Sequence, residues 1–322
     1  MSIEYLGPPQ FRKLSETEGR DERRVSNWIT PWDTQEAIDV GIIGVPWATS
    51  TMADTVLSAT PNNIRKALVH LTTFNPDYDI DVQDLKVRYV GDVGLHQTDI
   101  NENIRRVESA LTAVFKPKPS YVPLILGGAG AVTWLAATSY AKATGQSLGI
   151  IHFDSRNDMR SLDEGGPTDF TPMRGILDAG VGIQGKNIAQ VGLHGFVGTL
   201  AEHKYAKSQG VTTITAREVH KGGIEAAMSS AVGAASQGTD AIYITIDGSV
   251  LDIPYAYLSA STTPGGLSGE EMAEAMYILG QNPKVKLLDL VDIYTYLDDT
   301  ENVARMAASL IMSFLAGYHQ RK

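Results

Sequence analysis

Two carboxylates and an arginine follow directly after an apolar run near the middle of the chain. The run covers residues 149–153 and is followed directly by Asp154. Arg156 and Asp158 come next, at intervals of two residues. Carboxylates can ligate a hard cation, bind a cationic ligand or exchange a proton. Arg156 can also pair with either carboxylate, so the group could be no more than a structural ion-pair cluster. The pattern favours a site at this point and leaves both interpretations open.

Other residues that could take part in binding or catalysis follow apolar runs in the same way. Asp247 follows residues 241–246, Asp292 follows residues 285–291, and Gly127 with Gly128 follows residues 121–126. If these runs are parallel strands, their carboxyl ends share one edge of a sheet, where open α/β proteins bind ligands. We therefore expect these positions to converge with Asp154. His194 ends another run, residues 187–193, but a lone imidazole is a weaker sign of function.

The elements that position these residues are predicted by periodicity. From residue 38 onward, eight apolar runs of strand length alternate with longer amphipathic stretches, which is typical of βα units. This predicts a three-layer α/β/α fold with a central eight-stranded parallel sheet. Residues 1–34 are polar and irregular and are expected to form an N-terminal arm, with residues 35–322 as a single α/β domain. His152 lies inside an apolar run, and we interpret it as a core histidine rather than a ligand.

Bulk composition excludes several classes of function. The net charge of -10 disfavours binding to nucleic acid or to an anionic membrane surface, because both would be repelled. The chain has no cysteine, so any metal would be held by His, Asp or Glu. No window approaches the roughly 18 apolar residues of a membrane span, and the N-terminus lacks the pattern of a signal peptide. A cytoplasmic protein is expected.

Several segments give the chain a resemblance to the ureohydrolase superfamily, which includes arginases, agmatinases and formiminoglutamases. The scaffold segments that carry it are residues 61–65, 151–154, 264–268 and 289–292. The resemblance implies two manganese ions at the carboxyl edge of an eight-stranded sheet, with a metal-bridging hydroxide that attacks a guanidinium or formimino carbon. It also implies a homo-oligomer, either a trimer or a hexamer.

The positions that would carry this chemistry differ from the family pattern. Gly130, Arg156 and Ser249 stand where the family has two histidine ligands and one aspartate ligand. The family positions retained are Asp154, Asp158 and Asp247. Asp169 begins a segment that matches a His-Gly-Thr-Pro segment of many relatives, and Asp292 replaces a glutamate that binds the guanidinium.

These departures predict a site without manganese. Too few ligands remain for two ions, and a permanent cation at Arg156 would repel a metal. We therefore expect no cofactor, and an acidic site that takes a small cationic amine or guanidino compound, in a pseudoenzyme or a metal-independent enzyme. Asp158 or Asp169 would serve as the acid or base beside Arg156. The expected ligand contacts are Asp154, Asp247, Ser249, Asp292, Gly130 and His194.

Two alternatives remain open on the sequence. The chain could be an active hydrolase of linear C–N bonds, similar to agmatinase or formiminoglutamase, with manganese or magnesium on the all-oxygen set Asp154, Asp158 and Asp247. It could also be an inactive subunit that assembles with an active paralogue.

Overall fold

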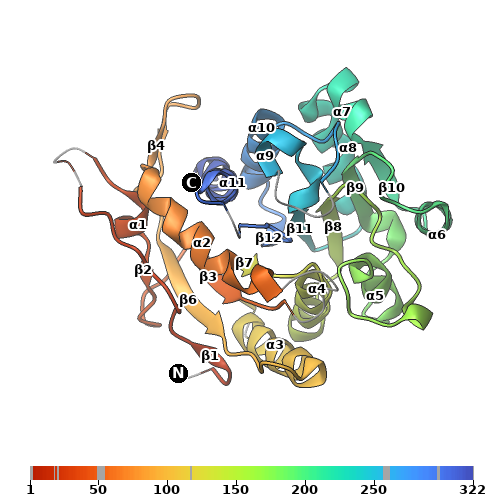
Figure 1. The fold of residues 1–322 in the computed structure, drawn as a ribbon, viewed down its shortest axis with the longest axis horizontal. Helices are drawn as coiled ribbons and strands as arrows, with labels where there is room; N and C mark the ends of the chain where they lie inside the picture. The colour runs from red at the N-terminus through yellow and green to blue at the C-terminus, as the bar shows by residue number, and fades with distance from the viewer. Residues whose placement is uncertain are drawn as a thin grey trace.

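A ten-stranded, mostly parallel sheet forms the centre of the molecule in the computed structural model (Figure 1). The structure describes residues 3–17, 19, 22–48, 55–116, 118–256, 262–295 and 298–321. The main path of the sheet runs β1-β6-β3-β7-β12-β11-β8-β9-β10. Its eight long parallel strands are β3 (Val40–Val45), β6 (Val87–Val93), β7 (Val122–Gly127), β8 (Leu148–Phe153), β9 (Ile188–Leu193), β10 (Thr212–Thr215), β11 (Ala241–Asp247) and β12 (Val285–Val291).

Two short strands from the N-terminal arm extend this sheet beyond the eight predicted strands. β1 (Leu6–Gly7) pairs antiparallel with β6, and β2 (Thr30–Pro31) pairs parallel with the same strand. Strands of two residues have no hydrophobic periodicity, so the sequence did not indicate them. The arm also contacts the sheet through the backbone N–H of Gln10, which donates to Asp92 Oδ2 at 2.8 Å.

Helices cover both faces of the sheet, which confirms the predicted three-layer fold. One hydrophobic core joins the sheet to α2 (Thr60–Ala67), α8 (Ile224–Ala235), α10 (Gly269–Gln281) and α11 (Asn302–His319). The other joins the opposite face to α3 (Ile100–Phe115), α4 (Ala131–Thr144), α5 (Pro172–Asp178) and α6 (Leu200–Ser208). Neighbouring strand residues alternate between the two cores, as Ile42 and Ile43 do. The remaining helices are α1 (Val25–Trp28), α7 (Ala216–Gly222) and α9 (Ile253–Ala256).

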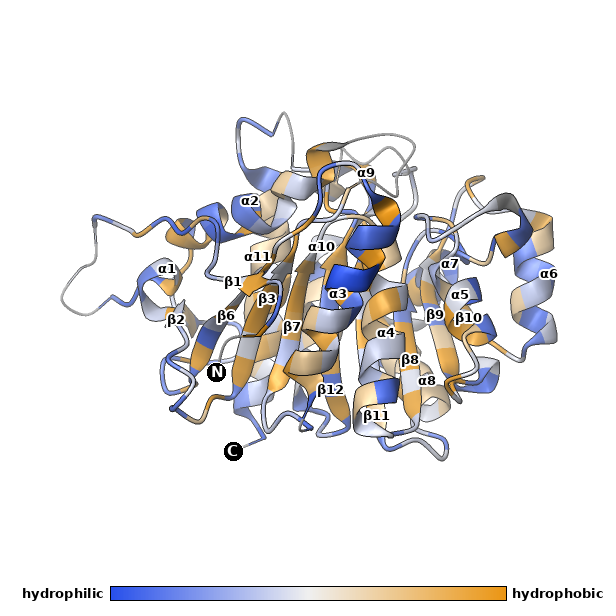
Figure 2. Cartoon of the chain, turned by 90° about the horizontal axis from the view of Figure 1, so that it is seen from below, coloured by the Kyte–Doolittle hydropathy of each residue, from blue (hydrophilic) through white to orange (hydrophobic). Residues whose placement is uncertain are grey.

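The hydropathy pattern follows from these two cores. Strands buried on both faces are nearly continuously apolar, and Figure 2 shows them in hydrophobic colours behind helices such as α3, which carry hydrophilic residues on their outer side. Among the described residues, no helix combines the length and the apolar character needed to cross a membrane.

Candidate functional site

Four adjacent strands deliver the predicted residues to one place. β7, β12, β11 and β8 are neighbours in that order, so the residues that follow them lie side by side at the carboxyl edge of the sheet. These residues are Gly128, Asp292, Asp247 and Asp154. The backbone N–H of Asp292 donates to Gly128 O at 2.8 Å, which ties the ends of two of these strands together.

Asp154 is fully buried, and its two oxygens have different surroundings. Oδ1 accepts hydrogen bonds from the Ser249 hydroxyl at 2.9 Å and from the backbone N–H of Arg156 at 3.0 Å. Oδ2 lies 3.1 Å from His152 Nε2, off the line of a good hydrogen bond, and accepts no other one. Ser249 therefore holds one side of Asp154, while the other side stays available to a cation.

Arg156 lies among the acids rather than in solvent. Its Nε donates to Asp158 Oδ1 at 2.9 Å, and its side chain is 6% exposed. The guanidinium carbons of Arg156 and Arg160 each lie 4.3 Å from the centre of the Phe170 ring, a cation–π arrangement. Phe170 thus helps to fix Arg156 against Asp158.

A second part of the site is formed by Gly130, Asp169 and Asp292. The backbone N–H of Gly130 donates to Asp169 Oδ1 at 3.1 Å. A Cβ atom at Gly130 would lie only 2.9 Å from Asp292 Oδ2, so this position has little room for a larger side chain unless Asp292 moves. Both carboxylate oxygens of Asp292 are buried and accept no hydrogen bond in the described part of the chain, and the same holds for Asp247 Oδ2.

Burial and mutual repulsion dominate the protonation of these acids. Burial, followed by the charge of Asp154, raises the pKa of Asp247 to about 6. Burial and the charge of Asp247 raise the pKa of Asp169 to about 7. The pKa values of Asp158 and Asp292 are also well above the usual range, first through burial and then through neighbouring carboxylates. These acids therefore hold their protons to higher pH than isolated aspartates do, because Arg156 cannot stabilise all of their negative charges at once.

Asp154 is the exception among these acids. Burial alone would raise its pKa, but the contact with His152 and the positive charge of Arg156 outweigh burial, so the pKa of Asp154 falls below its ordinary value. Asp154 is therefore the carboxylate that stays ionised most readily.

Two of the acids have unusual backbone conformations. Asp158 has φ 52° and Asp292 has φ 51°, both in the left-handed region that non-glycine residues rarely adopt. Such conformations are maintained where the surrounding structure requires them, and they cluster at functional sites. The positions of both carboxylates are thus set by the local backbone as well as by their neighbours.

His194 is the predicted site residue whose side chain is not directed at the acids. Its Nδ1 lies 2.7 Å from Gly192 O, and its Nε2 lies 3.1 Å from Thr263 O. Only its backbone N–H reaches the site region, where it donates to Ser155 O at 3.0 Å. The imidazole therefore links the end of β9 to the loop that contains Thr263.

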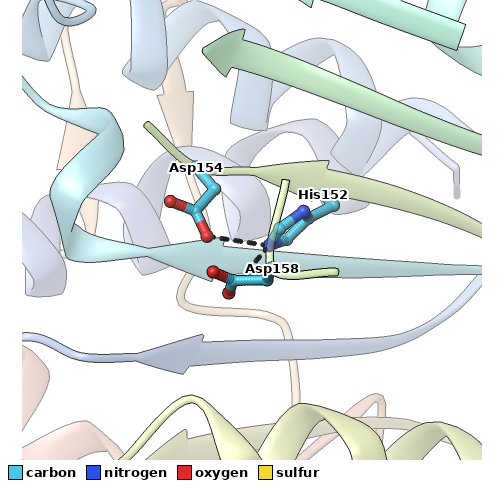
Figure 3. A group of neighbouring side chains, drawn as sticks. All are labelled: His152, Asp154 and Asp158. Carbon is cyan, nitrogen blue, oxygen red and sulfur yellow. Dashed lines mark ion pairs between the residues drawn. The ribbon is translucent and has the colours of Figure 1, made fainter. Parts of the chain in front are cut away.

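His152, interpreted from the sequence as a core histidine, lies at the site. His152, Asp154 and Asp158 form a buried group whose ligand atoms lie within 4.8 Å of one another and could hold a metal ion (Figure 3). Residues two apart on a strand point to the same face, so the spacing of His152 and Asp154 could have revealed this contact. The unpartnered oxygens of Asp154 and Asp247 also fit a bound cation.

Comparison with known proteins gives consistent results. Residues 38–317 match the sequence profile of the arginase family. Formimidoylglutamase of Halalkalibacterium halodurans is 31% identical over 287 residues, with 89% of each chain covered. The crystal structure of formimidoylglutamase from Bacillus subtilis superposes with a TM-score of 0.89 at 30% identity, covering 96% of each chain. A Trypanosoma cruzi formiminoglutamase structure with Mn²⁺ has a TM-score of 0.81 at 21% identity, covering 94% of this chain and 100% of the other.

The expectation that the site takes no cofactor is wrong. His152, Asp154 and Asp158 form a buried group whose ligand atoms lie close enough together to hold a metal ion. The sequence argument failed because it treated the charge of Arg156 as decisive. In the structure this charge is shared among four carboxylates, those of Asp158, Asp154, Asp247 and Asp292. One guanidinium cannot balance that many acids, so a divalent cation is compatible with its presence.

Proposed function

Because the chain belongs to the arginase family, we propose that it is a metal-dependent hydrolase of linear C–N bonds that acts on a formimidoyl amino acid. The observation that carries this proposal is the pair of buried carboxylates Asp154 and Asp158, which lie with His152 in a group that could hold a metal ion. The substrate class is supported by relatives that are 30–31% identical over most of their length and are formimidoylglutamases. These findings favour a hydrolase over the interpretation as a pseudoenzyme.

The carboxylates of Asp154 and Asp158 would hold the cation, with Asp247 as a further oxygen donor. A divalent cation there supplies Lewis acidity, which lowers the pKa of water and polarises the substrate. Arg156 holds Asp158 Oδ1 in a fixed position and offsets part of the negative charge. The Ser249 hydroxyl likewise holds Asp154 Oδ1 in a fixed position, without a charge of its own.

The remaining acids would act on the substrate. A formimidoyl group is a cationic amidine, and the buried carboxylate of Asp292, which accepts no hydrogen bond from the described residues, suits it. Water adds to the formimidoyl carbon, and the bond from that carbon to the amino-acid nitrogen breaks. The nitrogen takes a proton, which leaves the free amino acid and formamide. Asp169 has a pKa of about 7, so it can exchange a proton near neutral pH.

The proposal is tested by incubating the protein and Mn²⁺ with N-formimidoyl-L-glutamate and measuring released glutamate. Asp158→Asn should lower kcat/KM by at least about 100-fold, because the neutral amide binds a divalent cation more weakly than the charged carboxylate that it replaces. Asparagine tolerates the left-handed backbone at this position, so the variant keeps the local fold. The exposed Asp163→Asn serves as a matched control and should retain activity. No glutamate release with Mn²⁺, or an unaffected Asp158→Asn variant, would contradict the proposal.

A further inference from the structure

A buried chain of amide and imidazole groups lies directly behind the acids. Gln190 Nε2 is 3.0 Å from His152 Nδ1 and 2.8 Å from the backbone O of Asn157. Asn157 Nδ2 in turn donates to Gln190 Oε1 at 2.6 Å. His152 on β8 and Gln190 on β9 are direct partners in the parallel register, so the sheet itself brings the two side chains together.

The direction of these hydrogen bonds is fixed by the backbone. A carbonyl oxygen can only accept, so the Gln190 atom that meets Asn157 O must be the nitrogen with its two hydrogens. The second hydrogen of this nitrogen faces His152 Nδ1. An amide flip would place Gln190 Oε1 against Asn157 O and two oxygens would repel. His152 Nδ1 therefore accepts a hydrogen bond, and the ring carries its hydrogen on Nε2.

The Nε2 atom faces the site. It lies 3.1 Å from Asp154 Oδ2 and 3.9 Å from Asp158 Oδ2, and Figure 3 shows both contacts converging on it. A ring nitrogen that carries hydrogen has no lone pair in the ring plane, so it cannot bind a metal ion. Its N–H lies beside the two carboxylates, although off the line of a good hydrogen bond to Asp154 Oδ2.

We propose that His152 is a positioning residue rather than a metal ligand, locked by Gln190 with its hydrogen on Nε2 so that a polar N–H is held next to Asp154 and Asp158. This inference rests on the proposed function for the presence of a metal, but its hydrogen-bond part does not. An oxygen-only ligand set follows, and such a set favours Mn²⁺ or Mg²⁺ over Zn²⁺, which prefers imidazole and thiolate ligands.

The hydrogen position is tested without any metal. Long-range ¹H–¹⁵N correlation spectra of metal-free protein labelled with ¹⁵N-histidine distinguish the two neutral forms, and His152 is assigned by the loss of its signals in His152→Asn. We expect the Nε2–H form. In Gln190→Leu the donor to Nδ1 is lost, so the signals should shift toward the Nδ1–H form. An Nδ1–H form in the wild-type protein would overturn the inference, even if the variant fails to fold.

The ligand set is tested on the Mn²⁺-loaded protein. Pulsed EPR should show no strong ¹⁴N coupling from a directly bound imidazole in the wild type. In Gln190→Leu the donor to Nδ1 is lost, which lets the hydrogen move to Nδ1 and frees Nε2. This variant should gain the ¹⁴N coupling and bind Zn²⁺ at least about tenfold more tightly. Strong ¹⁴N coupling in the wild type overturns the inference. If Mn²⁺ does not bind at all, the proposed function fails, and the metal-free spectra alone decide the role of His152.

Discussion

Arg156 Nε donates to Asp158 Oδ1 at 2.9 Å inside a buried cluster of carboxylates. A permanent cation therefore lies in direct contact with a residue that would help to hold a metal ion. The pair explains how four neighbouring acids can be buried together, because one guanidinium interacts with all of them. The pair also leaves fewer oxygens for a metal ion, because Asp158 Oδ1 already accepts a hydrogen bond from Arg156.

Replacing Arg156 with histidine should strengthen metal binding. The change removes a charge that opposes a divalent cation and supplies an imidazole donor. Two like charges near the surface of a protein interact by a few kcal/mol, and each 1.4 kcal/mol is a factor of ten, so Mn²⁺ affinity should rise at least about tenfold. Isothermal titration with Mn²⁺ measures this.

Arg156→Ala is the control for that experiment, because it removes the charge without adding a ligand. It should give a smaller gain than the histidine variant. If Arg156→His binds Mn²⁺ no more tightly than the wild type does, the guanidinium of Arg156 does not oppose the cation.

Phe170 should stabilise the fold through the two arginines that contact its ring. Both guanidinium carbons lie 4.3 Å from the ring centre, and a cation–π contact contributes roughly 0.5–2 kcal/mol depending on burial. Phe170→Leu keeps apolar bulk and removes the ring, so it should lower the free energy of unfolding by about 1–2 kcal/mol relative to Phe170→Tyr. Urea denaturation of the two variants gives the difference, and equal midpoints would argue against a role for the ring.

Most of the fold could be predicted from the sequence. All eight long strands overlap the predicted runs, and strands such as β3, β8 and β11 are nearly continuously apolar because they are buried on both faces. The convergence of Asp154, Asp247 and Asp292 followed from the same register, since parallel strands share one carboxyl edge. The short strands β1 and β2 carry no such pattern and were not predicted.

The side-chain contacts within the site were harder to predict from the sequence. The apolar neighbours of His152 in the sequence favoured a place in the core, although its spacing of two residues from Asp154 indicated the same side of the strand. The pairing of His152 with Gln190 depends on the register between two strands 38 residues apart. The effect of Arg156 on a metal depends on how many acids share its charge, and spacing along the chain does not reveal that number.

Asp289 should give the protein a distinctive dependence of stability on pH. Its carboxylate is fully buried and accepts hydrogen bonds from the Tyr243 and Thr133 hydroxyls. Burial raises its pKa from 3.8 to about 6. The folded state therefore binds this proton more readily than the unfolded state between those values. The contribution of Asp289 to the free energy of unfolding should fall as pH rises through this window, by on the order of 2 kcal/mol.

Asp289→Asn removes this titration. Compared with the wild type, the variant should lose less stability between pH 4 and pH 6, as measured by urea denaturation at several pH values. Asp77→Asn, at an exposed position, is the matched control and should keep the wild-type slope. If Asp289→Asn and the wild type share one slope, the raised pKa of Asp289 is refuted.

The most direct test of the account is the amount of Mn²⁺ that the protein binds. Equilibrium dialysis of metal-free protein against Mn²⁺, followed by elemental analysis, should give about one ion per chain, because the buried oxygens of Asp154, Asp158 and Asp247 suit a single hard cation. Asp154→Asn should lose this ion, whereas Asp163→Asn should keep it. A wild-type protein that binds no Mn²⁺ at millimolar concentration would contradict the account.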